Sequence, residues 1–523
     1  MSDYKLIFKL KQHTPIIHFQ HEQHGATLRA SELKPKLDKF LIENSFGGIL
    51  KFDSYREFLI GDTKSIEKGL KEIDNNSSIQ DKENTKTEYL QELKLAFDYK
   101  LSISSMNSKR FLLGFPRKQY IKDNKSKIAN YKLLWDNQFP NYFGNMKKEG
   151  EVKEPKEFIV NKKIIDGEII VFDHDLRKRI SDRLIEFFFL NNFGTRQNKG
   201  FGSFEVIEIE GVKPKLPEKT DEYPFFDINL ADINMNTRFY NPNNSTYLPK
   251  SIGNKKVELK KKFNSLLKEK LYESENEIQY LFKIHNLFYR MELFYKTLRS
   301  GINIPNKLYF KSLMFQYAKR LTPSQQWDKR TIREHFYKNF TGYKNLLAKT
   351  YSNESTLKFS PTGNHEKDKL LFRDLLGLSS MQQWRFYDND TITKEGKKKI
   401  NDQVVIQRFK SPITFKPIEI EENLFRVYIF CHPIPEEYLG EKIHMNSTKF
   451  SKGNPLELKI PEQFDVCEYL FNAITLFILQ ENDSEYYEDH FKQYVDNSNS
   501  EESKYLLDIF SQLNNYYLSK DYQ

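Results

Sequence analysis

In the segment FGTRQNKGFGSF, three glycines flank two cations in a pattern that suits phosphate binding. They are Gly194, Gly200 and Gly202 around Arg196 and Lys199. Glycines remove Cβ bulk, so a sugar-phosphate chain can approach peptide N–H groups closely, and the cations add attraction. The segment therefore predicts a loop that binds a phosphodiester backbone. A helix end with cations that only face water is the alternative that the glycines alone leave open.

Phe201 lies between two of these glycines and is expected to stack on a nucleobase. Two glycine-containing nucleotide motifs are excluded. A dinucleotide fingerprint has its glycines after a strand and before a helix, whereas a helical pattern precedes this loop. A Walker A loop requires Gly-Lys-Ser/Thr, and Gly202-Ser203 lacks the lysine.

The elements that position the loop follow from hydrophobic periodicity. Alternating apolar residues predict four β-segments, and apolar residues at helical spacing predict two helices between them. The order is β-α-β-β-α-β, that of the ferredoxin-like or RRM-like split βαβ arrangement, so the fold class is α+β. The β-segments are expected at residues 4–19 with an irregularity at Pro15, 97–104, 157–172 and 204–210, and the helices at 31–44 and 174–194.

Local signals refine this outline. Ser31 is the expected N-cap of the first helix, and Gly194 is the expected terminator of the second. Asp166-Gly167 predicts a hairpin turn within the third β-segment. The stretch DNNSSIQDKENTKTE, residues 74–88, has no apolar face and is expected to be a surface loop or a disordered insertion.

Bulk composition narrows the class of protein. The 523 residues predict two or three domains, and 15% aromatic residues supply large cores. The 82 Lys and Arg against 72 Asp and Glu give +10, which favours a polyanionic partner without proving one. Two cysteines exclude a disulfide framework and fit a reducing compartment. With no signal-peptide pattern and no apolar run of membrane-spanning length, we expect a soluble cytoplasmic protein.

The loop FGTRQNKGFGSF resembles the glycine-rich loop of the RAMP superfamily, the RRM-like proteins of CRISPR effector complexes. GATLRASELKPKLDKFL, residues 25–41, is similar to a second signature of that superfamily, at the start of the first helix. With the TPIIHF strand before them, these segments most resemble the first-numbered RAMP subunit of the type III-B (Cmr) complex. The resemblance covers roughly the first 210 residues.

This resemblance implies a non-catalytic subunit that binds CRISPR guide RNA (crRNA), near the guide 3′ end, and helps capture target RNA in antiviral defence. Its partners would be guide RNA, target RNA and other RAMP subunits, with no cofactor and no membrane. The start of the first helix adds a positive dipole end to this site. The residues expected to bind RNA are Arg29, Ser31, Lys34, Lys36, Gly194, Arg196, Gln197, Asn198, Lys199, Gly200, Phe201, Gly202 and Ser203.

The resemblance also implies two RRM-like domains. We expect the N-terminal one at 1–213, a linker at 214–253, a helical insertion at 254–400, and the rest of a diverged C-terminal domain at 401–523. The second half lacks another glycine loop of this kind, so RNA contact there would depend on scattered Lys and Arg.

A nuclease is the alternative from another class. His13, His18, His21 and His24 lie in or after the first strand, and a histidine suits general-base attack by an RNA 2′-OH. Zinc binding is disfavoured, because no Cys or Asp completes a ligand set. CRISPR repeat-processing endoribonucleases carry the glycine loop near the chain end, and target-cleaving subunits use an Asp after the first strand. This segment has Glu22 instead. A metal-independent endoribonuclease therefore remains the minority alternative.

Overall fold

The computed structural model divides the chain into two compact units. The first unit contains Met1–Tyr223, Ile228–Phe288 and Phe415–Tyr428, and the second contains Pro224–Asp227, Tyr289–Thr414 and Ile429–Gln523. The structure describes residues 3–17, 28–76, 78–79, 81–104, 108–112, 115–121, 130–136, 157–161, 163–231, 275–303, 309–321, 327–337, 369–384, 387, 390–400, 403–406, 409–450, 454–478 and 501–521.

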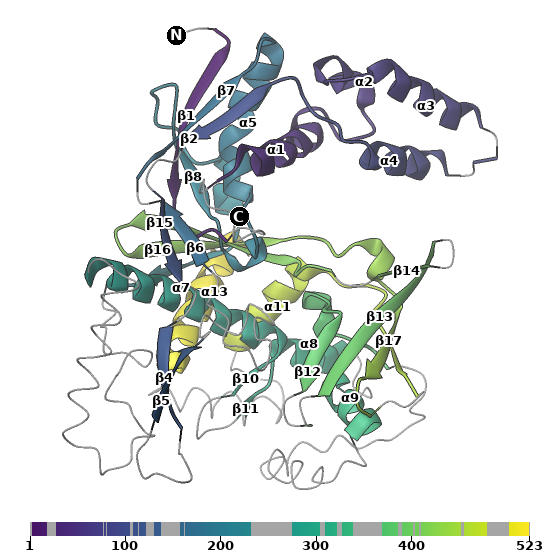
Figure 1. The fold of residues 1–523 in the computed structure, drawn as a ribbon. Helices are drawn as coiled ribbons and strands as arrows, with labels where there is room; N and C mark the ends of the chain where they lie inside the picture. Colours follow the sequence, from purple (N-terminus) through teal and green to yellow (C-terminus); the bar gives the residue numbers. More distant parts are fainter. Residues whose placement is uncertain are drawn as a thin grey trace. The chain divides into compact units, whose positions relative to one another are not determined.

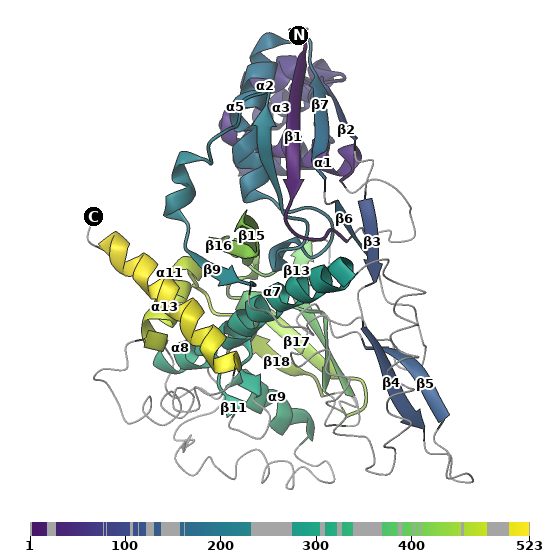
Figure 2. The same cartoon turned by 90° about the vertical axis from the view of Figure 1, so that its left-hand side faces the viewer.

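A four-stranded antiparallel sheet in the order β2-β7-β1-β8 organises the first unit (Figures 1 and 2). Two helices join these strands, in the chain order β1-α1-β2-β7-α5-β8 when inserted elements are set aside. This is the element order that the sequence predicts. The bounds are β1 Lys5–Gln12, α1 Ala30–Ser45, β2 Lys100–Ser104, β7 Ile165–Ile170, α5 His174–Leu190 and β8 Phe204–Ile209.

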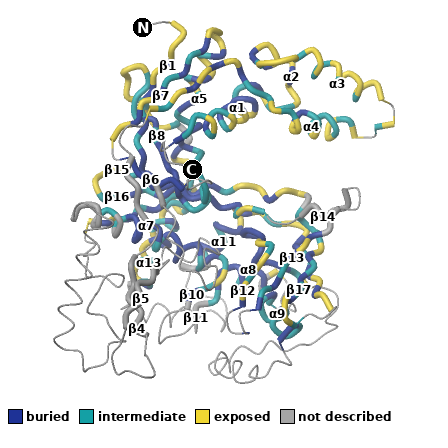
Figure 3. Tube along the Cα trace, viewed as in Figure 1, coloured by how far each residue is buried: buried dark blue, intermediate teal, exposed yellow. Residues whose placement is uncertain are grey.

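Both helices cover the same face of this sheet. Leu6, Phe8 and Leu10 alternate along β1, are buried, and belong to one apolar core with residues of α1 and α5. Alternate residues of a strand share one face, so this cluster places both helices on that side. The two helices also touch directly, because the rings of Phe40 and Phe187 lie 5.4 Å apart. Figure 3 shows this buried interior in dark blue.

The opposite face of the sheet carries paired charges. Lys5 approaches Glu168 at 3.4 Å, and Lys9 approaches Glu208 at 2.8 Å, in each case across neighbouring strands. Within the described strands β1, β2, β7 and β8, this face presents no aromatic ring. A base-stacking platform on the sheet, the mode by which RRM domains bind RNA, therefore lacks its side chains here.

Two helices occupy much of the polar stretch at 74–88. Asp62 caps the N-terminus of α3 through Ser65 N at 3.1 Å, and Asp81 caps α4 through Asn84 N at 3.0 Å. Side-chain caps of this kind support helices that have little apolar surface. The prediction of a loop or disordered insertion is therefore wrong for residues 74–75 and 82–88, which lie in α3 and α4. The elements between α1 and β2 are α2 Phe52–Tyr55, a 3-10 turn Arg56–Phe58, α3 Thr63–Asn75 and α4 Lys82–Glu92.

The predicted hairpin at Asp166-Gly167 is also wrong. Both residues lie inside β7, where Gly167 pairs with Phe8 and Ile103 on its two neighbours. A Cβ on Gly167 would lie 2.2 Å from the Phe8 ring, so this glycine serves ring packing and not a turn. Two separate two-stranded antiparallel sheets are present. One pairs β3 Ser108–Leu112 with β6 Glu157–Asn161, and the other pairs β4 Phe115–Ile121 with β5 Asn130–Asp136.

Two predicted helix ends are displaced. The N-cap of α1 is Arg29, with extended backbone and no side-chain cap, so Ser31 lies within the first turn. Helix α5 ends at Leu190 with Asn191 as its C-cap, and the Asn191 amide donates to Phe187 O at 2.9 Å. Gly194 therefore belongs to the following loop and does not terminate the helix.

The remaining elements form smaller sheets and helices. A three-stranded sheet has the order β15-β16-β9, and a five-stranded sheet has the order β12-β13-β17-β18 with β14 paired to β13. Gly301 at φ +79° follows α7 and donates to Lys296 O at 2.7 Å, as a glycine that ends a helix does. The bounds are β9 Phe225–Asn229, α7 Glu275–Arg299, β10 Ile302–Asn303, β11 Tyr309–Phe310, α8 Leu313–Leu321, α9 Asp328–Tyr337, β12 Met381–Trp384, β13 Asp390–Ile400, β14 Gln403–Ile406, β15 Ile413–Glu421, β16 Leu424–Cys431, β17 Lys442–Ser447, β18 Leu456–Lys459, α11 Val466–Ile478 and α13 Glu501–Asp521.

A second apolar core lies in the second unit. The ring of Phe294 lies 5.4 Å from that of Phe226 and 5.3 Å from that of Phe510. Tyr469 is buried and donates to Leu298 O at 2.7 Å. In the parts of the chain that the structure describes, no helix combines the length and apolarity needed to cross a membrane.

Candidate nucleic-acid interface

Residues 193–203, here called the glycine loop, connect α5 to β8 in a strongly bent conformation. Gly194, Arg196, Gly200 and Gly202 all have positive φ, between +64° and +84°. A Cβ on Gly202 would lie 1.9 Å from Phe193 O, so only glycine fits that position. The glycines predicted from sequence are thus needed for the shape of the loop itself.

Most peptide N–H groups of the glycine loop already have partners inside the protein. Gly194 N donates to the Glu32 carboxylate at 2.5 Å, and Gly202 N donates to Pro15 O at 2.8 Å. The expectation that the loop offers its N–H groups to a phosphate is therefore wrong for these positions. The N–H donors bonded within the protein are Phe193, Gly194, Thr195, Lys199, Gly200, Gly202 and Ser203.

Helix α1 and the glycine loop are in direct contact, as the two sequence signatures predict for one site. Lys36 Nζ donates to Asn192 O at 2.9 Å and to Gln197 Oε1 at 2.6 Å. The Gln197 amide in turn donates to Gly194 O at 2.6 Å. Lys36 and Gln197, both predicted to bind RNA, therefore hold the loop against the helix.

Lys34 contacts Asp38 and the residues that precede β2. Its Nζ donates to Phe97 O at 2.8 Å, approaches Asp38 Oδ2 at 3.1 Å, and lies 3.8 Å from the Tyr99 ring centre. Burial raises the pKa of Asp38, and Lys34 partly offsets that rise. Lys34 therefore compensates a buried carboxyl. Ser31 is exposed and Arg29 is partly exposed at the start of α1.

The prediction that Phe201 stacks on a base is wrong. Its ring is 0% exposed and stacks on Phe288, with ring centres 4.1 Å apart and planes 10° from parallel. An aromatic ring packed face to face in a core has no open face for a nucleobase. Gly200, Gly202 and Ser203 are buried beside it, which leaves the preceding residues of the loop at the surface.

Thr195, Arg196, Gln197, Asn198 and Lys199 are the partly exposed polar residues of the glycine loop. Burial lowers the pKa of Arg196 to about 10, so its guanidinium still carries a charge at neutral pH. Arg196 and Lys199, three positions apart on this internally bonded turn, supply positive charge there. This geometry suits the binding of a phosphodiester through side chains.

Lys416, from β15, was not predicted from sequence, yet it contacts the glycine loop at both ends. Its buried Nζ donates to Phe188 O at 2.7 Å, Asn191 O at 2.9 Å and Phe204 O at 2.9 Å. The one available signal was a lysine between apolar residues of a predicted strand, ITFKPI. Its acceptors are main-chain carbonyls, which leave no pattern in a sequence.

His13 is the one candidate general base that the structure describes. His18, His21 and His24 lie outside the described residues. The His13 ring is buried, accepts from Glu419 N at Nδ1 (3.0 Å), and therefore presents Nε2–H to the Glu205 carboxylate at 3.1 Å. Burial lowers the pKa of His13, opposed by Glu205. This arrangement ties His13 into the structure through both ring nitrogens.

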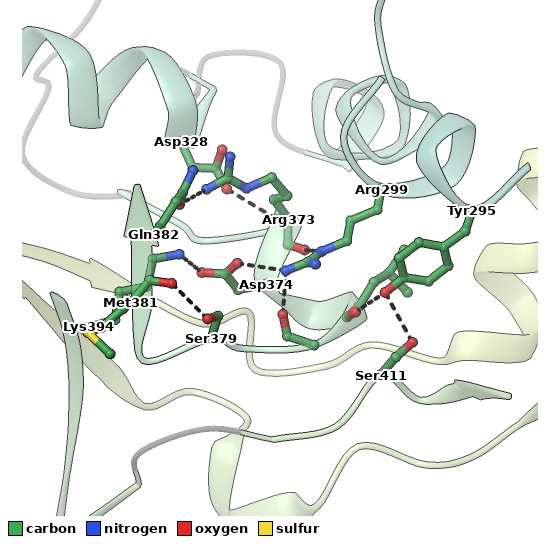
Figure 4. Close-up of polar contacts among 12 residues, drawn as sticks. Tyr295, Arg299, Asp328, Arg373, Asp374, Ser379, Met381, Gln382, Lys394 and Ser411 are labelled. Carbon is green, nitrogen blue, oxygen red and sulfur yellow. Dashed lines mark hydrogen bonds and ion pairs between the residues drawn. The ribbon is translucent and has the colours of Figure 1, made fainter. Parts of the chain in front are cut away.

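A second cluster of charges lies inside the second unit (Figure 4). Asp374 forms an ion pair with Lys394 and approaches Arg299 Nη2 at 3.4 Å, while Asp328 Oδ2 accepts from Arg373 N at 3.1 Å. Burial raises the pKa of Asp374, but the surrounding cations outweigh this effect and hold it below its ordinary value. We call these residues the charge network. Asp374 thus has two cationic partners within the core of this unit, which indicates an architectural role.

No group of three or more histidine, cysteine or acidic side chains with metal-binding geometry occurs within the described part of the chain.

Both halves of the chain match domains of one family of CRISPR type III-B proteins. Residues 3–302 match the family model of the Cmr1 N-terminal domain, and residues 309–477 match that of the Cmr1 C-terminal domain. The chain belongs to the Cmr1 family.

Comparison with solved structures found a chain in the cryo-EM structure of the Type III-B Cmr-beta bound to cognate target RNA. Identity to that chain is 12% with a TM-score of 0.20, and the match covers 40% of this chain and 60% of the other. No match was found among the curated proteins.

Proposed function

We propose that this chain is a non-catalytic, guide-RNA-binding subunit of a type III-B CRISPR (Cmr) effector complex. In this proposal it holds RNA near the guide 3′ end, helps capture target RNA in antiviral defence, and adjoins other RAMP subunits. Its fold consists of two ferredoxin-like domains, one at 1–213 and a diverged one that ends in 401–523 and carries a helical insertion. Membership of the Cmr1 family supports the assembly.

The contact between α1 and the glycine loop is the observation that carries the RNA-binding proposal. Lys36, Gln197 and Glu32 join the two segments, so the partly exposed Arg196 and Lys199 stand beside the N-terminal turn of α1. A helix N-terminus adds partial positive charge to that location. In this proposal the contact with RNA is made by side-chain cations on a fixed turn, and the peptide N–H groups of the glycine loop contribute little.

The paired charges on the sheet provide the matched comparison. Lys9 and Lys100 lie on the uncovered face, where Lys9 is neutralised by Glu208. Removal of two charges there changes the net charge as much as removal of Arg196 and Lys199. A specific RNA site predicts unequal effects, whereas general electrostatic attraction predicts equal ones.

The test measures binding of the full chain to a labelled single-stranded RNA over a range of salt concentrations. Arg196→Ala with Lys199→Ala should weaken binding about tenfold or more and reduce the salt slope by about two. Lys9→Ala with Lys100→Ala should leave affinity within about twofold. Equal losses in the two double variants would refute a site at the glycine loop.

The same incubation distinguishes the nuclease alternative. Intact RNA after long incubation in a chelator supports a binding subunit. A discrete cleavage product that disappears with His18→Ala or His21→Ala would establish a metal-independent endoribonuclease instead.

A further inference from the structure

We propose that Lys416 is a positioning residue that clamps both ends of the glycine loop and thereby sets its affinity for RNA. The RNA part of this inference rests on the proposed function. Phe188 and Asn191 lie at the end of α5, before the loop, and Phe204 begins β8, after it. One ammonium group therefore fixes the separation of the two stems from which the loop projects.

The number of acceptors identifies the protonation state that the clamp requires. Three carbonyl oxygens within 2.9 Å of Lys416 Nζ need three N–H donors, which only the ammonium form supplies. Two of these carbonyls end a helix, where the partial negative charge favours a cation. Burial lowers the pKa of Lys416, opposed by the charge of Glu205, while Lys36 adds to the lowering.

A second contact from the same strand supports the clamp. Asn192 Nδ2 donates to Phe415 O at 2.8 Å and to Gln197 O at 2.8 Å, so it links β15 to the tip of the loop. Residues 415–428 belong to the first unit, although they are far from the glycine loop in the sequence. Lys416 is 0% exposed and does not reach solvent. Its effect on RNA must act through the loop.

The first measurement is amide hydrogen exchange of the full chain. In Lys416→Met, the amides of Gly200, Gly202 and Ser203, which are bonded within the folded loop, should exchange at least about tenfold faster. Ile180→Ala, a truncation in the buried face of α5, is the control for general loss of stability. Exchange no faster than in Ile180→Ala would overturn the clamp.

The second measurement is RNA affinity in two backgrounds. Lys416→Met should weaken binding about tenfold in the otherwise native chain and less than about twofold when Arg196 and Lys199 are already alanine. Equal losses in both backgrounds would show that Lys416 acts elsewhere and would overturn the inference. Faster loop exchange with unchanged RNA affinity would retain the clamp and refute RNA binding by the loop, so the two failures are distinguishable.

If Lys416→Met does not fold, Asn192→Ala tests the same arrangement. It removes the second link between β15 and the loop without burying a new group. Its expected result is a smaller loss of affinity, about threefold, again absent in the Arg196 and Lys199 double variant. An affinity equal to that of the native chain would overturn the inference.

Discussion

Lys394 in the second unit and Lys416 in the first are both buried, but their ammonium groups have different partners. Lys394 pairs with the Asp374 carboxylate, so its charge is neutralised by direct contact. Lys416 bonds to three uncharged carbonyls. The network stabilises a core with opposite charges, whereas the clamp shapes a backbone and leaves its cation uncompensated by direct contact. We expect substitutions in the charge network to lower stability, and substitution of Lys416 to change the conformation of the glycine loop.

The largest effect should come from breaking the charge network. Asp374→Asn leaves the buried Lys394 and the partly buried Arg299 without their anion, and should lower the free energy of unfolding by about 3–5 kcal/mol. Urea denaturation measures this change. The control is Asp53→Asn, which breaks an exposed pair with Arg56 and should cost less than about 1 kcal/mol. Similar costs for the two variants would remove the distinction between a buried network and ordinary surface pairs.

A smaller effect is expected from steric crowding of the glycine loop. Gly202 and Gly211 both have positive φ, but a Cβ on Gly202 would meet Phe193 O, whereas nothing lies within 4 Å of one on Gly211. Gly202→Ala should therefore cost about 1–3 kcal/mol more than Gly211→Ala. It should also weaken RNA binding, while Gly211→Ala should not. Thermal unfolding and binding assays on both variants measure the difference, and equal behaviour would contradict the packing argument.

The parts of these sites that follow from sequence are those with local patterns. Leu6, Phe8 and Leu10 reveal β1 through alternation, and the glycines around Arg196 reveal a bent, cationic loop. Contacts that depend on distant segments leave no such pattern. Phe201 looks available for stacking until Phe288 covers it, and Lys416 looks like one more cation until the fold brings three carbonyls to it.

Helices α3 and α4 do not follow from composition for another reason. The stretch 74–88 is polar, and a polar composition by itself favours a loop or disorder. Asp62 and Asp81 are good N-caps, and Lys71 pairs with Glu67 one turn earlier at 2.7 Å, so local polar contacts support helices there. Composition alone did not reveal these spacings.

Acid pH should affect the stability contributed by the contacts of Lys394 and that contributed by the contacts of Lys416 differently. The folded-state pKa of Asp374 lies below the ordinary value of 3.8, so as pH falls the unfolded chain takes up the proton first. The stability contributed by Asp374 is thus complete above about pH 4 and is lost as pH falls through the folded-state pKa. The pKa of Asp328 is raised by burial and changes in the opposite direction, so native and Asp374→Asn chains must be compared.

The expected result is that the stability difference between these two chains shrinks below about pH 4. The cost of Lys416→Met should change less over the same range, because its direct acceptors are carbonyls that do not titrate and Glu205 acts on it only through its charge. Urea titrations at several pH values measure both differences. A cost of Lys416→Met that fell with pH in parallel would mean that a carboxylate, such as that of Glu205, and not the carbonyls, holds this lysine.

The smallest effect is expected on the sheet face. Lys9→Ala removes a cation that Glu208 already neutralises at 2.8 Å, so RNA affinity should change by less than about twofold. Glu208→Ala tests the same point from the other side, because it exposes Lys9 as an uncompensated charge on a surface without aromatic rings in its described strands. If RNA used this face, Glu208→Ala would strengthen binding strongly. Unchanged affinity in both variants, beside a large loss with Arg196→Ala and Lys199→Ala, would locate RNA recognition at the clamped loop.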